Sequence, residues 1–267
     1  PRWEDPRLLR GGGRYSDDIN RSGQAYGHVV RSIHAHAVIN SIDVAAARAA
    51  PGVLAVYTGK DYAASGLGAI PCAVPRQKPD GSPMFTPPNM ALRTGRVRLV
   101  GDYVAFVVAE TLEQACDAGE LVEIDYSPLP SVTATMDATA DNAASVWDEC
   151  PDNVCFQFNL GDRAKTDAAF DAADHVTRLE MNITRVAVNP MENRACVAEY
   201  DKFDDRYTLY AGCQGPHGLR QAMAEPILKI PENRLRIVSD DMGGAFGMRS
   251  GPYCEYILCL WAAKNMD

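Results

Sequence analysis

Length, composition and charge exclude several classes of protein. The chain has 267 residues, of which 46% are hydrophobic and 23% charged. These values are typical of a soluble globular protein with a sizeable core, and they exclude a mainly disordered or fibrous chain. The formal net charge is −9, and an acidic surface repels the phosphate backbone of nucleic acids. We therefore predict one large domain or two ordinary ones, and no nucleic-acid binding.

The apolar runs and the cysteines indicate whether the chain spans a membrane and which cellular compartment it suits. The longest apolar runs, residues 103–109 and 256–263, fall far short of the roughly 20 residues that a membrane-spanning helix needs. The 8 cysteines form no C-x-x-C pair and match neither zinc-ribbon nor iron–sulfur spacings. Scattered thiols are typical of a reducing compartment. We expect a cytoplasmic protein without a membrane span.

The first half of the chain alternates strand and helix signals after a polar, Gly-rich lead-in. The predicted strands cover residues 25–33, 53–57, 104–108 and 122–126. One predicted helix runs from Asp43 to Ala50, and another begins at Thr111, which forms a capping box with Gln114. Residues 66–88 are rich in Pro and Gly and predict irregular chain. Together these signals predict an α+β domain over residues 1–130.

A linker rich in small residues, 131–150, precedes a second unit over residues 151–267. The strands predicted in this unit cover residues 179–183, 207–211 and 235–239. The predicted helices cover residues 166–174, 216–226 and 252–264. The last helix is apolar on nearly every side and needs partners. We therefore expect the chain to be a fragment of a longer protein, or its second domain to be completed by other segments.

A Gly-rich turn over residues 243–247 lies between the last predicted strand and the last helix. Its free amide groups near a helix start favour an anion, such as a phosphate or a metal oxo group. The spacing matches neither a Walker A loop nor the G-x-G-x-x-G dinucleotide fingerprint. A plain turn that lets strand and helix pack is the alternative, and the residues alone leave both open.

Other polar residues have a structural and a functional interpretation. Gln214 stands before Gly-Pro at a helix start, where its amide can face a ligand or satisfy backbone groups. His217 is interpreted as a cap or surface histidine. Glu192 and Arg194 predict an ion pair that fixes a loop. His34 and His36 alternate on one predicted strand face, are interpreted as exposed, and lack a third partner for a metal.

Several segments, taken in order, resemble one family. The lead-in over residues 4–19 and the segments at 97–102 and 123–130 are similar to its first part. Pro190-Met191-Glu192, Gln214-Gly215-Pro216-His217 and Gly243-Gly244-Ala245-Phe246-Gly247 resemble the start of its cofactor-binding region. The family is that of the molybdopterin-binding large subunits of xanthine dehydrogenase, aldehyde oxidase and aerobic carbon monoxide dehydrogenase. The resemblance to its N-terminal portion implies an α+β fold, with an α/β-hammerhead domain followed by the first part of the molybdopterin-binding domain.

The resemblance implies a molybdenum–molybdopterin cofactor, held as the cytosine dinucleotide. It implies hydroxylation of a small substrate with water as the oxygen source. The open substrate classes are N-heteroaromatics, aldehydes and carbon monoxide. It further implies a 2Fe-2S cluster on a small subunit and FAD on a medium subunit, assembled as a dimer of heterotrimers.

The resemblance also implies roles for particular residues. The residues expected to bind the cofactor are Gln214, Gly243, Gly244, Ala245, Phe246, Gly247 and Arg249. No residue of the chain is expected to ligate the metal or to be catalytic, because the family's general-base glutamate is expected beyond Asp267. Ser250 stands where purine-oxidising relatives carry a glutamate, which disfavours purines. The chain alone is then expected to be inactive, and a non-catalytic binding or assembly module is the alternative function.

Overall fold

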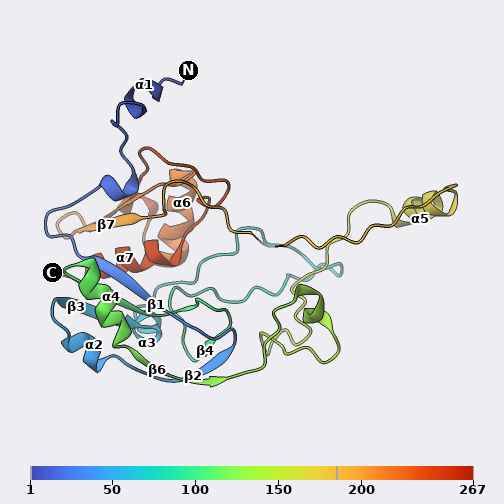
Figure 1. The fold of residues 1–267 in the computed structure, drawn as a ribbon, viewed down its shortest axis with the longest axis horizontal. Helices are drawn as coiled ribbons and strands as arrows, with labels where there is room; N and C mark the ends of the chain where they lie inside the picture. The colour runs from blue at the N-terminus through green and yellow to red at the C-terminus, as the bar shows by residue number, and fades with distance from the viewer. Residues whose placement is uncertain (1, 185, 267) are drawn as a thin grey trace.

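The computed structural model describes residues 2–184 and 186–266, which form three small sheets covered by helices (Figure 1). The strands are β1 (Tyr26–Arg31), β2 (Ala37–Asp43), β3 (Val53–Thr58), β4 (Arg96–Val97), β5 (Tyr103–Ala109), β6 (Glu123–Pro128), β7 (Cys196–Asp201), β8 (Arg206–Ala211) and β9 (Leu235–Val238). The α-helices are α1 (Asp5–Leu8), α2 (Ala45–Ala49), α3 (Gly59–Ala64), α4 (Leu112–Glu120), α5 (Arg163–Asp171), α6 (Pro216–Met223) and α7 (Cys254–Asn265). In this described part, no helix is long and apolar enough to cross a membrane.

The first domain is built around β5. This strand pairs antiparallel with β1 on one side and β3 on the other, and residues 104–109 are all buried. The structure thus confirms the predicted strand with two buried faces. Helix α4 packs on β1 and β5, and its predicted capping box is present: Gln114 N donates to Thr111 Oγ1 at 3.2 Å, and Thr111 N donates to Gln114 Oε1 at 3.1 Å.

A second sheet in this domain, ordered β4-β2-β6, corrects the prediction for two histidines. Strand β2 begins only after His36, so His34 and His36 do not share a strand face. His36 is buried, and its Nδ1 lies 2.9 Å from the Pro130 carbonyl oxygen. Strand β2 was not predicted from the sequence, because its register shifts between Ile39 and Ser41 and this shift breaks the alternation of apolar and polar residues.

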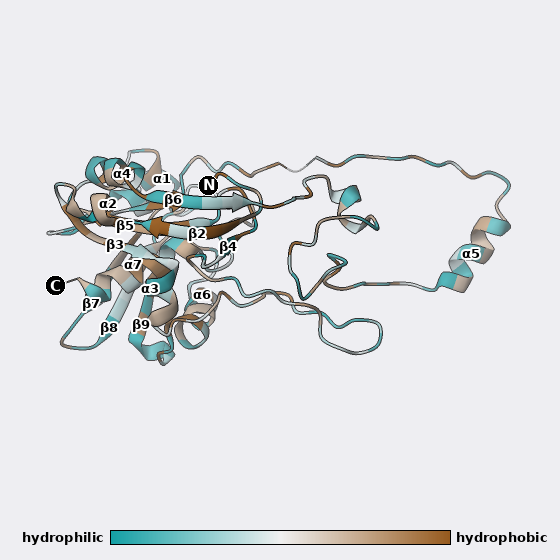
Figure 2. Ribbon diagram, turned by 90° about the horizontal axis from the view of Figure 1, so that it is seen from below, coloured by the Kyte–Doolittle hydropathy of each residue, from teal (hydrophilic) through white to brown (hydrophobic). Residues whose placement is uncertain are grey.

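An extended arm connects the two domains. Figure 2 shows chain on both sides of α5 that lies away from the sheets. Here the predicted strand over residues 179–183 is wrong: no described residue of this stretch is in a strand, and Leu179, Met181 and Ile183 are 77%, 70% and 87% exposed. The alternation is real, but a strand needs a neighbouring strand to pair with, and the described part of the chain places none beside the arm.

The second domain contains a βαβ unit. Strand β7, which the sequence did not reveal, pairs antiparallel with β8, and β8 pairs parallel with β9 through a crossover that contains α6. Helix α7 packs on β7 and β8. Because β8 and β9 are parallel and adjacent, the segments that follow them leave the sheet at the same edge. Those segments contain Gln214 and the Gly-rich turn.

The two domains share one hydrophobic core. Its buried side chains come from both sides, and α7 lies between the sheets (Figure 1). The indole of Trp261 on α7 lies 4.5 Å from the ring of Tyr57 and 5.5 Å from the ring of Tyr62, both from the first domain. The orientation of the second domain is therefore fixed by packing against the first.

Candidate cofactor-binding site

The candidate site lies where β8 and β9 end. Ligands of α/β units bind outside the carboxyl ends of parallel strands, and here those ends carry Gln214 and the turn 243–247. Gln214 N donates to the carbonyl oxygen of Arg249 at 2.9 Å, so the two segments run side by side. The Gln214 side chain is exposed, and its amide has no partner among the described residues.

The backbone of the Gly-rich turn leaves a run of amide groups free. Gly244, Phe246 and Gly247 have φ of +107°, +49° and +87°, the left-handed region that glycine enters without strain and phenylalanine rarely does. Within the described residues, the N–H groups of residues 244–247 donate to no acceptor. Phe246 is exposed, and strained backbone of this kind clusters at ligand sites. Adjacent free donors beside an amide side chain fit an anionic or oxo-bearing ligand.

A buried ion pair supports this turn from the interior of the protein. Arg249 Nη1 donates to Glu192 Oε2 at 2.6 Å, and Arg249 Nη2 donates to the Glu192 carbonyl oxygen at 2.6 Å. The same carboxylate accepts from Gly243 N at 2.8 Å, which fixes the start of the turn. A Cβ on Gly243 would lie 2.5 Å from the Glu192 Cβ, and one on Gly212 would lie 2.4 Å from Arg249 Nη1. The glycines therefore let the backbone close over the pair.

The pair changes two sequence-based interpretations. Glu192 does not pair with Arg194, whose Nη2 instead lies 2.9 Å from Glu255 Oε1. The Arg249 side chain, a cofactor contact by resemblance, is 0% exposed and points inward to Glu192. We therefore assign Arg249 to supporting the turn from inside rather than to contacting a ligand.

The lead-in contacts the residues that precede and support the same turn. Both Oδ atoms of Asp241 accept from the Arg7 guanidinium at 2.6 Å. Arg14 N also donates to Asp241 Oδ2 at 2.8 Å, and Asp241 N donates to the carbonyl oxygen of Arg14 at 3.0 Å. Ser16 N donates to Glu192 Oε1 at 3.1 Å, and Ser16 Oγ accepts from Gly212 N at 2.9 Å. Sequence reasoning missed these contacts because Arg7 and Asp241 are 234 residues apart and neither belongs to a local motif.

The ion pair between Arg7 and Asp241 should make the free energy of unfolding depend on pH. The hydrogen bonds from Arg7 lower the pKa of Asp241 to about 2. A carboxylate with a depressed pKa stabilises the fold above its unfolded pKa, and this contribution is lost as the pH falls through the folded pKa. The free energy of unfolding of wild type should exceed that of Asp241→Asn above about pH 5, and the difference should shrink towards about pH 2.

Urea denaturation across this pH range measures the difference. Arg7→Gln is the complementary variant, because it removes the other partner of the same ion pair. It should lose the same pH-dependent increment. A difference between wild type and Asp241→Asn that stays constant down to about pH 2 would contradict the assignment.

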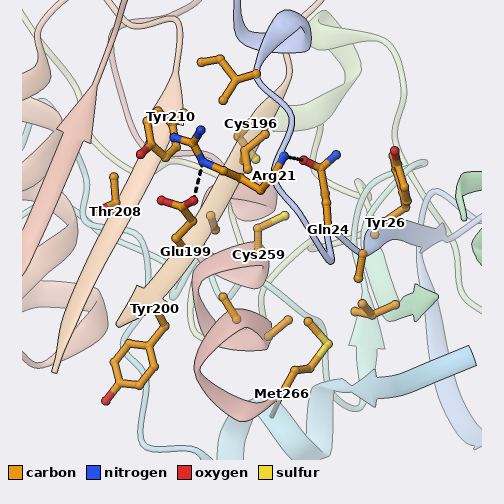
Figure 3. Close-up of a pocket in the computed structure, with 18 of the residues that line it drawn as sticks. Arg21, Gln24, Tyr26, Cys196, Glu199, Tyr200, Thr208, Tyr210, Cys259 and Met266 are labelled. Atoms are coloured by element: carbon orange, nitrogen blue, oxygen red, sulfur yellow. Dashed lines mark hydrogen bonds and ion pairs between the residues drawn. The ribbon is translucent and has the colours of Figure 1, made fainter. Parts of the chain in front are cut away.

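A separate groove lies between the domains (Figure 3). It has a volume of about 2100 Å³ and is lined by the lead-in, β1, β7, β8 and α7. Arg21 pairs with Glu199 across it and lies over the ring of Tyr210 at 4.5 Å. Among the described residues, none of those predicted to bind the cofactor lines this groove. We keep the candidate site at the strand ends, because unpaired donors converge there.

The remaining candidates supply no metal site. Within the described residues, no group of three or more His, Cys, Asp and Glu side chains could hold a metal ion. His217 is exposed on α6. Burial raises the pKa of the Cys254 thiol to about 11, as expected of an unreactive core cysteine.

Comparisons with known proteins agree with this arrangement. The family profile for the aldehyde oxidase and xanthine dehydrogenase a/b hammerhead domain matches residues 10–130, and that for the molybdopterin cofactor-binding domain matches residues 146–267. The carbon monoxide dehydrogenase large chain of Afipia carboxidovorans is 34% identical over 98% of this chain and 32% of its own length. The nicotine 6-hydroxylase large subunit of Paenarthrobacter nicotinovorans is 36% identical over 100% of this chain and 32% of its own length.

Solved structures give the same result. Quinoline 2-oxidoreductase from Pseudomonas putida 86 superposes with a TM-score of 0.87 at 32% identity, over 99% of this chain and 32% of that chain. A Cu,Mo-CO dehydrogenase in its carbon monoxide reduced state gives 0.86 at 32% identity, over 99% of this chain and 33% of that chain. The chain thus spans about a third of the length of the relatives it matches. It belongs to the xanthine dehydrogenase and aldehyde oxidase family, and it carries that family's hammerhead fold and molybdopterin cofactor-binding fold.

Proposed function

We propose that the chain is part of the large subunit of a molybdenum hydroxylase and supplies one wall of its cofactor site. The observation that carries the proposal is the set of free donors at the ends of β8 and β9: the amides of residues 244–247 and the Gln214 side chain. A dithiolene-bound molybdenum centre carries oxygen ligands and negative charge, which such donors suit. The residues present therefore fit the group.

When bound, this cofactor supplies two-electron oxidation of the substrate with water as the source of oxygen. The chain itself does three things. The amides of residues 244–247 and Gln214 donate hydrogen bonds to the cofactor, Glu192 and Arg249 hold those donors in place, and the lead-in fixes Asp241 and Glu192 beside the turn. Donors fixed in advance need no reorganisation when a charged ligand arrives.

The finer parts of the proposal follow the relatives. We infer the cytosine dinucleotide form of the cofactor, a 2Fe-2S small subunit, an FAD medium subunit and a dimer of heterotrimers. Relatives named large chain, large subunit and complex subunit gamma support a multi-subunit arrangement. The eight described thiols are all free, which supports a cytoplasmic location.

The substrate is proposed as a small N-heteroaromatic, an aldehyde or carbon monoxide. The nicotine and quinoline relatives share at least 32% identity with this chain and support the first class. Aldehyde oxidoreductase from Desulfovibrio gigas is 26% identical and supports the second less strongly. Ser250 in place of the glutamate of purine-oxidising relatives continues to disfavour purines.

Variants at the site test the proposal. Gln214→Ala removes the amide side chain, and Gly247→Ala places a Cβ at a φ of +87°. Each change should weaken cofactor retention about tenfold, the effect of losing one hydrogen bond to a charged group or of comparable strain. Molybdenum per protein, measured by elemental mass spectrometry on the native protein made in cells that synthesise the cofactor, gives the readout.

Matched controls separate the site from general destabilisation. Gln221 is an exposed glutamine on α6, and Gly66 has a φ of +76° with open space around it. Gln221→Ala and Gly66→Ala should keep the molybdenum content of wild type. If the site variants keep it as well, the turn is structural. The chain is then better described by the alternative, a non-catalytic binding or assembly module.

A further inference from the structure

One segment between the two domains has the residue pattern of a β-strand, although no described strand lies beside it. In residues 178–184, which we call the alternating segment, Leu179, Met181 and Ile183 alternate with polar residues. Side chains two positions apart in an extended chain point to the same side, so these three form one apolar face. All three are exposed. The segment therefore presents an apolar strand face that the described part of the chain does not cover.

The backbone of the alternating segment is available as well. Among the described residues, no N–H or carbonyl group of residues 178–184 takes part in a backbone–backbone hydrogen bond. A row of unpaired backbone groups is what a neighbouring strand pairs with. Extended segments bind the edge of a sheet in this way: backbone hydrogen bonds hold the segment, and alternate side chains enter pockets.

The chain just before the alternating segment is uncovered too. Helix α5 has no buried residue and lies away from the sheets (Figure 2). Phe170 on α5 is exposed. Soluble proteins seldom expose contiguous apolar surface unless it binds something, and long stretches without regular structure are uncommon. We therefore expect this region to be covered in the assembled protein.

The length of the relatives indicates what covers it. The carbon monoxide dehydrogenase large chain and the nicotine 6-hydroxylase large subunit each match this chain over 32% of their own length, so about two thirds of each lies outside the match. A second copy of the chain is the less suitable partner. Two alternating segments would form only a two-stranded ribbon, which is marginally stable in water, whereas an existing sheet supplies the further strands that stability needs.

The alternating segment is tied to the Gly-rich turn at its C-terminal side. Glu192 follows Ile183 by nine residues, a span of at most about 30 Å in extended chain. A Cβ on Gly244 would lie 3.3 Å from the Pro190 Cβ, and Gly243 N donates to the Glu192 carboxylate at 2.8 Å. A sheet that pairs with the alternating segment is therefore held within about 30 Å of the free amides of the turn.

We propose that the alternating segment is the docking site for the rest of the large subunit. Residues 178–184 add as a strand to the edge of a sheet in the portion that lies outside this chain. The face formed by Leu179, Met181 and Ile183 packs into the core of that portion, which then lies close enough to the turn to complete the cofactor site. This inference rests on the proposed function, because it takes the chain as part of a large subunit.

Hydrogen–deuterium exchange tests the pairing on the native complex isolated from source cells, with the 267-residue chain alone as the reference. In the complex, the amides of at least alternate residues in 178–184 should exchange about a hundredfold more slowly than in the chain alone. Equal rates in the two samples would overturn the proposal. Protection that already appears in the chain alone and increases with its concentration would assign the segment to a second copy, and would overturn it as well.

A photocross-link identifies the partner in the same complex. The variant Ile183→p-benzoylphenylalanine should link to a peptide of the large subunit outside the part that matches this chain. Links only to another subunit or to a second copy, or no link to that portion, would overturn the proposal.

A pair of variants tests the apolar face. Met181→Lys places a charge on it and should return the exchange of residues 178–184 in the complex to the rate of the chain alone. Leu160→Lys is the matched control, because Leu160 is an exposed leucine outside the alternating segment, and it should leave the protection unchanged. If the Met181→Lys complex fails to assemble, the wild-type comparison and the cross-link decide.

Molybdenum content separates this inference from the proposed function. A complex that contains molybdenum but exchanges residues 178–184 as fast as the chain alone would overturn the docking site and leave the proposed function standing. A protected segment that cross-links to the rest of the large subunit, in a complex without molybdenum, would support the docking site and count against the proposed function alone.

Discussion

Replacing Glu192 with glutamine is expected to lower the free energy of unfolding by about 3–5 kcal/mol. The physical reason is the burial of its partner: the Arg249 side chain is 0% exposed and that of Glu192 10%, so the variant leaves a guanidinium charge in the interior without a counter-charge. Glutamine keeps one acceptor, but Gly243 N and Ser16 N both used the lost carboxylate. The turn and the lead-in should therefore loosen together.

Urea denaturation of the two proteins measures the loss. The matched control is Asp167→Asn, which breaks the exposed pair between Arg163 and Asp167 on α5. Exposed pairs contribute about 0–1 kcal/mol, so the control should be nearly as stable as wild type. A loss below about 1 kcal/mol for Glu192→Gln would mean that the pair does not support the turn.

The second large effect is expected at Trp261. Its indole fills the core between α7 and the rings of Tyr57 and Tyr62, so Trp261→Ala should cost about 3–5 kcal/mol by leaving a cavity. Because the core is shared, both domains should lose stability in one transition. Thermal unfolding followed by circular dichroism and by calorimetry measures the loss and the number of transitions.

Trp3→Ala is the matched control for this variant. Trp3 is 98% exposed, so its removal leaves no cavity and should change the stability by less than about 0.5 kcal/mol. Two separated transitions in wild type, with only one of them moved by Trp261→Ala, would show that the domains have independent cores.

Local signals were readable from the sequence. The all-apolar run at residues 104–108 predicted the central strand, and Thr111 with Gln114 predicted the start of α4. The turn 243–247 is a candidate from sequence because its glycines allow tight backbone geometry and the close approach of a ligand, and Gln214 is one because it stands before Gly-Pro at a helix start. Each of these depends on residues within a few positions of one another.

The rest depends on partners that are distant in the chain. Glu192 and Arg249 are 57 residues apart, and nothing near Glu192 distinguishes Arg249 from Arg194 as its partner. The apolar and polar residues at 179–183 alternate with the period of a β-strand. A strand also needs a neighbouring strand to pair with, and alternation does not reveal whether one is present. Spacing alone left the turn open between an anion site and a plain turn; the family resemblance implied the cofactor class, and the match to the molybdopterin cofactor-binding domain supports it.

The most direct test of the central claim is the molybdenum content of the native complex isolated from its source cells, measured by elemental mass spectrometry. We predict molybdenum near one atom per copy of this subunit, with iron and flavin in the same complex. An intact complex that contains no molybdenum would contradict the account, because Gln214 and the amides of residues 244–247 would then serve only the fold.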